Sequence, residues 1–266
     1  MKQMKKNCRV LKELIRIRFQ RLMMFRLGFW GPFFVDGSMF LIQLLVFRAV
    51  YSNVDRIGSW GQGEVILYIG TFSLLNAVNM VVYFFGVIGI PDKIRRGEMD
   101  LYLTKPVSPL LRISFENINP GSLPLVAFSL AIIVYGVHRA GLRPDIRDIL
   151  AFCFWVFLMQ ILYYDMEVII RSAAFYLVTN AKLEQLEDAG LELCMKLPGV
   201  ALYGVYKFFF YCILPYGVMA TLPVQRMIGE MSPRLAVFGV GIVCVFTAIT
   251  VLLWKHGVRH YNSAGS

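Results

Sequence analysis

Residues 91–109 read PDKIRRGEMDLYLTKPVSP, and this segment decides how the 266-residue chain is organised. It is rich in charged residues and begins and ends with proline, whereas the segments on both sides are strongly apolar. A charged segment between two apolar runs is typical of a loop that leaves a membrane and enters water. The loop therefore predicts a membrane-spanning segment on each of its two sides.

The composition of the whole chain supports a membrane protein. Hydrophobic residues make up 58% of the chain and charged residues 17%, and the mean hydropathy is +0.61. A soluble domain has about 45–50% apolar and about 25% charged residues. Several apolar runs approach about 20 residues, the length that an α-helix needs to cross a bilayer. We therefore expect an all-α integral membrane fold with a single transmembrane domain over residues 1–266.

The apolar runs predict six transmembrane helices behind an N-terminal helix. Residues 1–27 place most basic and apolar side chains on opposite faces, as expected for an amphipathic helix that lies on a membrane surface. Gly86 and Gly89, near the end of the second span, favour close helix packing. The fifth span is interrupted by Pro215. The six predicted spans are residues 30–50, 65–90, 118–137, 149–178, 200–220 and 235–254.

The loops between the predicted spans differ in charge. Residues 1–27, a loop at 91–117, a second loop at 179–198 and the C-terminal tail hold 18 Lys and Arg, whereas the opposite loops, including an external segment at 221–234, hold 6. Because cytoplasmic loops collect Lys and Arg, we expect both termini and residues 91–117 in the cytoplasm. Anionic membrane lipids as partners then account for the net charge of +10. The sequence contains no nucleic-acid-binding motif, so we do not expect nucleic acid as a partner.

The unusual ionisable residues inside the predicted spans are Arg48, Asp165, Glu167, Arg171 and Lys207. Charged groups within a membrane are costly, so each is a candidate functional residue. Glu167 and Arg171 are four residues apart and are expected to pair along one helix face. Asp165 and Glu167 point about 200° apart on a helix, so they do not form a single carboxylate pair. The alternative function based on this group is an ion-coupled secondary transporter or channel.

Motifs for catalysis are missing from the sequence. It contains no Walker motif, GxSxG or HExxH, so we expect neither an enzyme nor a bound cofactor. His256 and His260 share a helix face but have no third ligand nearby, and no metal site is expected. The five cysteines lack CxxC spacing. A membrane-embedded lipid enzyme would need a nucleophile or metal site that these residues do not supply.

The topology and one motif resemble the permease subunits of bacterial type-two ABC exporters. That motif, I-R-x-G-x-x-D-x-x-L-x-K-P-V-x-P, is formed here by Ile94, Arg95, Gly97, Asp100, Leu103, Lys105, Pro106, Val107 and Pro109. Supporting matches are Tyr68, Gly70, Thr71, Leu214, Pro215, Pro223, Gly229, Gly257, Arg259, Tyr261 and Ser263. The group Asp165, Glu167 and Arg171 departs from the family pattern, in which that helix is normally uncharged.

The resemblance implies that this chain works with other subunits in a bacterial inner membrane. A separate cytoplasmic ATPase would bind ATP and Mg²⁺, and two permease chains, identical or paralogous, would form the path for export. It also implies that residues 92–103 form a coupling helix that contacts the ATPase, that residues 179–198 make a second contact, and that the segment before the sixth span is an external re-entrant feature. The residues implied in coupling are Asp92, Lys93, Arg95, Arg96, Gly97, Glu98, Asp100, Leu103, Lys105 and Pro106.

Overall fold

A computed structural model describes residues 56–177 and 179–261, together with the isolated residues 16, 34, 37, 38, 42 and 45. The described ranges fold into helices and contain no β-strand element. The predicted surface helix at residues 1–27 and the predicted first span at residues 30–50 lie outside the continuously described ranges. The all-helical prediction is confirmed for the rest of the chain.

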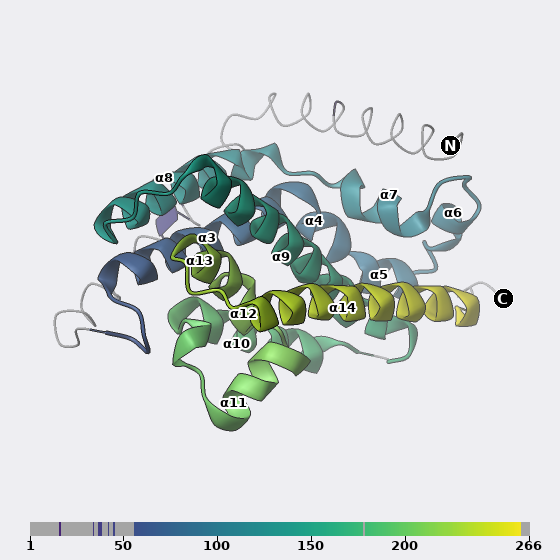
Figure 1. The fold of residues 1–266 in the computed structure, drawn as a ribbon. Coiled ribbons are helices and arrows are strands. Elements are labelled where there is room, and N and C mark those ends of the chain that lie inside the picture. Colours follow the sequence, from purple (N-terminus) through teal and green to yellow (C-terminus); the bar gives the residue numbers. More distant parts are fainter. Residues whose placement is uncertain are drawn as a thin grey trace.

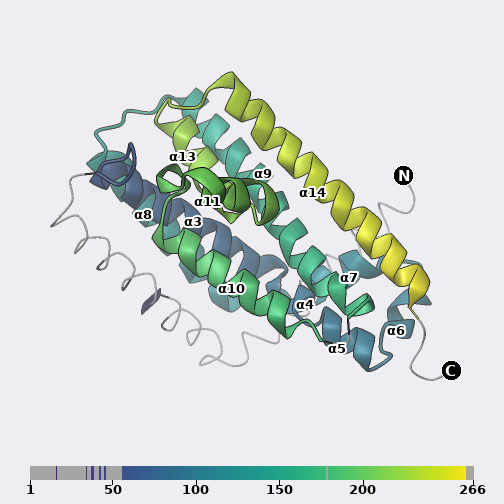
Figure 2. The same ribbon diagram turned by 90° about the horizontal axis from the view of Figure 1, so that it is seen from below.

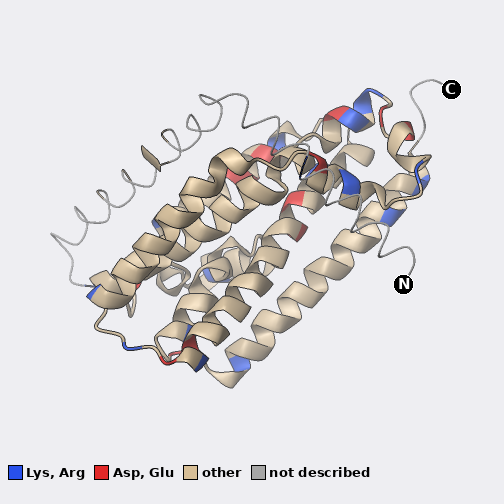
Figure 3. Cartoon of the chain, turned by 90° about the horizontal axis from the view of Figure 1, so that it is seen from above, with Lys and Arg blue, Asp and Glu red and all other residues tan. Residues whose placement is uncertain are grey.

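Four long helices form the body of the protein (Figures 1 and 2). Each lies in a segment that is long and apolar enough to cross a membrane, and these candidate spans overlap the second, third, fourth and sixth predicted spans. The four helices are α3 (Gln62–Val82), α8 (Leu123–Arg139), α9 (Ile146–Ser172) and α14 (Pro233–His260). We call the end of the bundle that contains residues 56–62 the Trp60 end, and the end that contains residues 90–116 the Pro91 end. Most of the shafts are uncharged, and the Lys and Arg residues gather toward the two ends (Figure 3).

Glycines bring α3 and α8 into close contact. A Cβ atom on Gly136 would lie 2.5 Å from the backbone nitrogen of Leu67, and one on Gly70 would lie 2.8 Å from that of Ile133. These neighbours are backbone atoms of rigid helices, so no larger residue fits without a shift. Gly86 similarly packs α4 (Phe84–Val87) against α7 (Pro109–Glu116), which confirms its predicted packing role. Gly89 makes only ordinary contacts.

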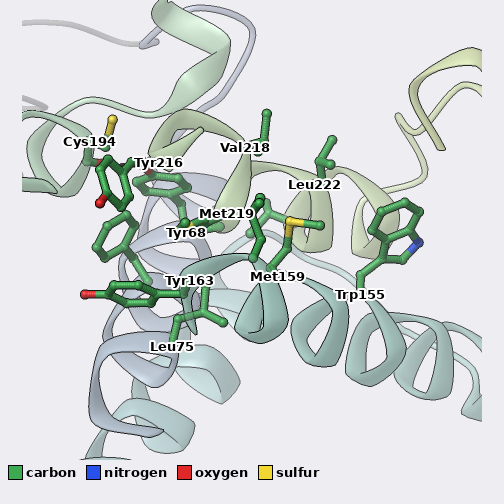
Figure 4. Packing of buried hydrophobic residues seen from close by; sticks show 14 of the residues in the cluster. Tyr68, Leu75, Trp155, Met159, Tyr163, Cys194, Tyr216, Val218, Met219 and Leu222 are labelled. Atoms are coloured by element: carbon green, nitrogen blue, oxygen red, sulfur yellow. Dashed lines mark hydrogen bonds between the residues drawn. The ribbon is translucent and has the colours of Figure 1, made fainter. Parts of the chain in front are cut away.

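The apolar core lies where α9 faces α3 and two short helices, α12 (Tyr216–Met219) and α13 (Thr221–Met227). Figure 4 shows Met159 of α9 beside Met219 of α12. In the most apolar window of α14 only 28% of the residues are buried, compared with 67% for α3. Most of α14 therefore presents apolar side chains to the outside of the described bundle, as expected for a helix in contact with lipid.

The fifth span predicted for residues 200–220, with its interruption at Pro215, is a bent pair of helical segments and not one continuous helix. The chain forms α11 (Gly204–Phe208) and a π-helical turn (Phe209–Ile213), and then bends by 83° into the segment Tyr216–Met227. Pro215 lies at the break, as predicted, because proline cannot donate the backbone hydrogen bond that would continue the helix. Hydropathy alone does not reveal this change of direction.

Both ends of the bent segment lie at the Trp60 end. Val200, just before α11, lies beside Gly58, and the indole nitrogen of Trp60 donates a hydrogen bond to Glu230 over 3.2 Å. Arg226 of α13 pairs with Asp148 near the start of α9, over 3.4 Å. The segment therefore enters and leaves the bundle at one end.

The return from the Pro91 end is made by α10 (Ala181–Lys196), which replaces the loop predicted at residues 179–198. Near its start, Asn180 donates hydrogen bonds to the carbonyl oxygens of Ile170 and Arg171 at the end of α9. Near its other end, the hydroxyl of Tyr68, in the first half of α3, donates to the carbonyl oxygen of Cys194. Figure 2 shows α10 running alongside α3 between the two ends.

Candidate functional site

The segment at the Pro91 end that is expected to contact an ATPase consists of two short helices, α5 (Ile90–Arg95) and α6 (Asp100–Leu103). The single helix expected over residues 92–103 is therefore interrupted. Gly97 has a φ of +73°, which places it in the left-handed region that glycine adopts without steric cost. The amide of Glu98 donates to the carbonyl of Lys93 over 2.9 Å and that of Gly97 to Ile94 over 3.2 Å. This pairing is a Schellman motif, which ends a helix and turns the chain.

Prolines limit the segment on both sides, as the sequence predicted. Pro91 occupies the first turn of α5, where a missing N–H group costs least, and α6 ends before Pro106. Pro109 is the first residue of α7. The element between the prolines is therefore short and compact.

Charged and aromatic side chains fasten α5 and α6 to α7. The ammonium group of Lys93 lies 3.0 Å from the carboxylate of Glu116, and the Tyr102 hydroxyl donates to the same carboxylate over 2.8 Å. The guanidinium of Arg112 lies 4.9 Å from the centre of the Tyr102 ring. Burial opposes the charge on Lys93, but its interactions with Glu116 and Tyr102 outweigh this, and its pKa is raised.

An apolar cluster beneath these side chains connects the segment to two long helices. Ile90, Ile94 and Met99 are buried in it, and it also contains Val168 of α9 and Trp254 of α14. A displacement of α5 or α6 would therefore act directly on α9 and α14, because packed side chains transmit displacement between elements.

The ten residues expected to couple differ in exposure. Glu98 and Asp100 are half-buried, as are Lys93 and Gly97. The exposed ones are Asp92, Arg95, Arg96, Leu103, Lys105 and Pro106. Leu101 was missed by the sequence reasoning, although it is 64% exposed on α6. Its exposure depends on how α6 lies against α7, which the sequence does not show.

The intramembrane ionisable residues form two groups. The carboxylate of Glu167 pairs with the guanidinium of Arg171 over 3.3 Å, which confirms the predicted pairing. Arg171 also pairs with Glu187 of α10. All three are buried, with Glu167 and Glu187 1% exposed and Arg171 4% exposed. Since charges are stable away from water only when paired, the three residues form one unit, which we call the ion cluster.

The ion cluster connects four elements. The side-chain amide of Asn79 on α3 donates to Glu167 over 3.3 Å, and the hydroxyl of Tyr216 on α12 donates to Glu187 over 3.1 Å. Glu187 was missed because residues 179–198 were interpreted as a loop. The signal was present, since Glu187, Gly190 and Cys194 recur on one helix face and form the buried face of α10.

Asp165 faces away from the ion cluster and toward α14. Its carboxylate accepts a hydrogen bond from the Thr247 hydroxyl over 2.6 Å, and its backbone carbonyl accepts one from Thr250 over 3.4 Å. The prediction that Asp165 and Glu167 do not form one carboxylate pair is confirmed. Lys207 lies apart from both groups, exposed on α11. Arg48 lies outside the described residues, and the other four therefore do not form one site.

A comparison with protein families identifies the family of this architecture. The model of the family described as ABC-2 family transporter protein matches residues 38–265. The chain belongs to the ABC-2 family. No match was found among curated proteins or among solved structures. The chain is therefore an ABC-2 type permease and a multi-pass membrane protein, and such permeases generally work with an ABC ATPase.

In this ABC-2 permease the charged group that departs from the family pattern is accounted for by packing. Arg171 pairs with Glu167 and with Glu187, and the Asp165 carboxylate accepts a hydrogen bond from Thr247 of α14. The Arg171–Glu187 pair joins α9 to α10, and the Thr247–Asp165 hydrogen bond joins α9 to α14. The described contacts of these side chains therefore hold helices together.

Proposed function

We propose that this ABC-2 permease is the membrane subunit of an ATP-driven exporter and that a separate cytoplasmic ATPase docks on the Pro91 end. The observation that carries the proposal is the exposed surface of α5 and α6. It combines the apolar side chains of Leu101 and Leu103 with the basic side chains of Arg95, Arg96 and Lys105. An apolar contact surrounded by charge is typical of a docking surface that is also soluble when free.

Coupling requires that movement of the ATPase reaches the membrane helices. The segment is suited to this because Lys93, Glu116 and Tyr102 hold it as one body, and Ile94 and Met99 pack it against α9 and α14. A displacement of docked α6 would then change the packing of these two helices. The coupling element in this proposal is the pair α5 and α6 with the Gly97 turn between them.

The remaining parts of the proposal follow the family resemblance. Two permease chains, the same or paralogous, form the path between them, with both termini in the cytoplasm of a bacterial cell and the protein in its inner membrane. ATP and Mg²⁺ bind to the partner ATPase and not to this chain. Transport is directed outward.

The test is co-purification of the tagged permease with an ABC ATPase, followed by measurement of ATP hydrolysis in proteoliposomes. Leu101→Asp places a charge in the proposed contact and is expected to abolish co-purification while leaving the melting temperature unchanged. The double variant Glu98→Lys with Asp100→Lys is expected to uncouple hydrolysis from transport. Ile146→Asp is the matched control, because Ile146 is 62% exposed at the Trp60 end. Full coupling in both Pro91-end variants would refute this docking surface.

A further inference from the structure

A pocket of 330 Å³ lies between the bent segment and α14, near the Trp60 end. Lys207, Phe208 and Tyr211 form one wall, and Gln225, Leu235 and Phe238 form the other. Phe238 is five residues into α14, which corresponds to about 7–8 Å from the start of that helix. Aromatic and basic side chains near the ends of transmembrane helices are typically found at the level of the lipid headgroups.

Two polar groups of the pocket wall have neither an ion-pair nor a hydrogen-bond partner among the described residues. No carboxylate in the described ranges pairs with the ammonium group of Lys207, which lies 5.4 Å from the centre of the Tyr211 ring. The side-chain oxygen of Gln225 is buried and accepts no hydrogen bond from any described group. Buried polar groups normally have hydrogen-bond partners, and a cation inside a membrane normally has a counter-charge. A ligand with an anionic group and a hydrogen-bond donor would satisfy both.

The apolar surface beside these groups continues along α14. Three residues beyond Phe238 on the same face, a Cβ atom on Gly241 would meet no atom within 4 Å. Val245, one further turn along, is 56% exposed. Phe208 on α11 is 60% exposed, and the Tyr211 and Phe238 rings stack with centres 6.3 Å apart. A flat aromatic wall followed by an open strip of small apolar residues fits an acyl chain.

We propose that this pocket binds an anionic lipid. Its phosphate pairs with Lys207, a headgroup hydroxyl donates to Gln225, and an acyl chain follows α14 past Gly241. The site does not depend on the ATPase or on the direction of transport. A glycerol-bearing headgroup fits better than a choline headgroup, because choline has no hydroxyl to donate and carries a positive charge toward Lys207.

The test is native mass spectrometry of the detergent-purified full chain, titrated with phosphatidylglycerol or phosphatidylcholine. We expect tighter binding of phosphatidylglycerol to the wild type. Lys207→Gln should weaken it by about fivefold, since one basic residue near a lipid surface contributes about 1 kcal/mol. Lys207→Arg should retain it, and Cys212→Trp should block the pocket, which Cys212 also lines. The matched control is Lys255→Gln, an exposed lysine near the opposite end of α14.

Three results would overturn the proposal. The first is equal affinity of the wild type for the two lipids. The second is an equal loss in Lys207→Gln and Lys255→Gln, which would indicate general attraction to a basic surface. The third is displacement of phosphatidylglycerol by an equal concentration of inorganic phosphate, which would show that the site binds the anion without the lipid.

Discussion

Replacement of Arg171 by methionine tests whether the ion cluster stabilises the fold. The substitution keeps an unbranched apolar side chain but removes the cation that pairs with Glu167 and Glu187. Both carboxylates are 1% exposed, so water cannot replace the lost partner. Removal of one partner from a buried ion pair costs about 3–5 kcal/mol.

This loss corresponds to a large change in melting temperature. At about 2–4 °C per kcal/mol for a chain of roughly this size, Arg171→Met should lower the melting temperature by roughly 6–20 °C. The assay is thermal unfolding of the detergent-purified protein, followed by tryptophan fluorescence. Arg95→Met is the control, because Arg95 is exposed and its ion pair with Asp92 lies in water.

A triple variant separates the loss of pairing from the loss of packing. Glu167→Gln and Glu187→Gln, added to Arg171→Met, remove both stranded carboxylates. Neutral replacement of a complete buried ion group is often close to neutral in stability, so the triple variant should recover most of the lost melting temperature. The role of the ion cluster would be refuted if Arg171→Met were as stable as Arg95→Met. It would also be refuted if the triple variant were no more stable than Arg171→Met alone.

Three further predictions concern the helix contacts and the Pro91 end. Gly136→Ala forces a Cβ atom against the Leu67 backbone and should lower the free energy of unfolding by about 1–3 kcal/mol, measured by thermal unfolding. Gly241→Ala, with open space around the new Cβ atom, should not destabilise the protein. Equal effects of the two substitutions would contradict the packing account. Thr247→Val removes the hydroxyl that bonds Asp165 and should cost about 1–3 kcal/mol, and Thr247→Ser, which keeps the hydroxyl, should preserve most of the stability. The pKa of Lys93 is raised above its usual 10.5, so its stabilising interaction is fully present below that pH and is lost as the pH rises through the folded-state pKa. The melting temperature of the wild type should therefore fall more than that of Lys93→Met as the pH rises above 10.5, and parallel curves would show that Lys93 contributes nothing.

The four long helices were predictable because length and apolarity are enough to identify them. Residues 62–82 and 233–260 contain long apolar runs, and a helix satisfies its own backbone hydrogen bonds in lipid. The change of direction within the bent segment could not be predicted from the sequence. Pro215 marks the break, but the 83° angle depends on packing of Tyr216 and Met219 against α9 and on the contact of Val200 with Gly58. These contacts join residues that are far apart in the sequence.

The prolines and charges of residues 91–109 predicted a segment distinct from the long apolar helices, and the structure shows two short helices there. The division of this segment at Gly97 follows from the Schellman motif, and a glycine within a charged run is a recognisable signal for such a turn. The exposure of Leu101 and the burial of Met99 were not predictable, because they depend on how α6 lies against α7.

The polar character of α10 and the charges of α9 have one explanation. Taken alone, residues 181–196 are too polar for a predicted span, and Glu167 and Arg171 are out of place in α9. The charges of the two helices compensate for each other, because Arg171 of α9 pairs with Glu187 of α10. The rest of the buried face of α10 consists of Gly190 and Cys194. The hydroxyl of Tyr216 extends the same network to the bent segment. A polar helix is therefore stable within this bundle because α9 supplies its counter-charge, and averaged hydropathy does not detect such a helix.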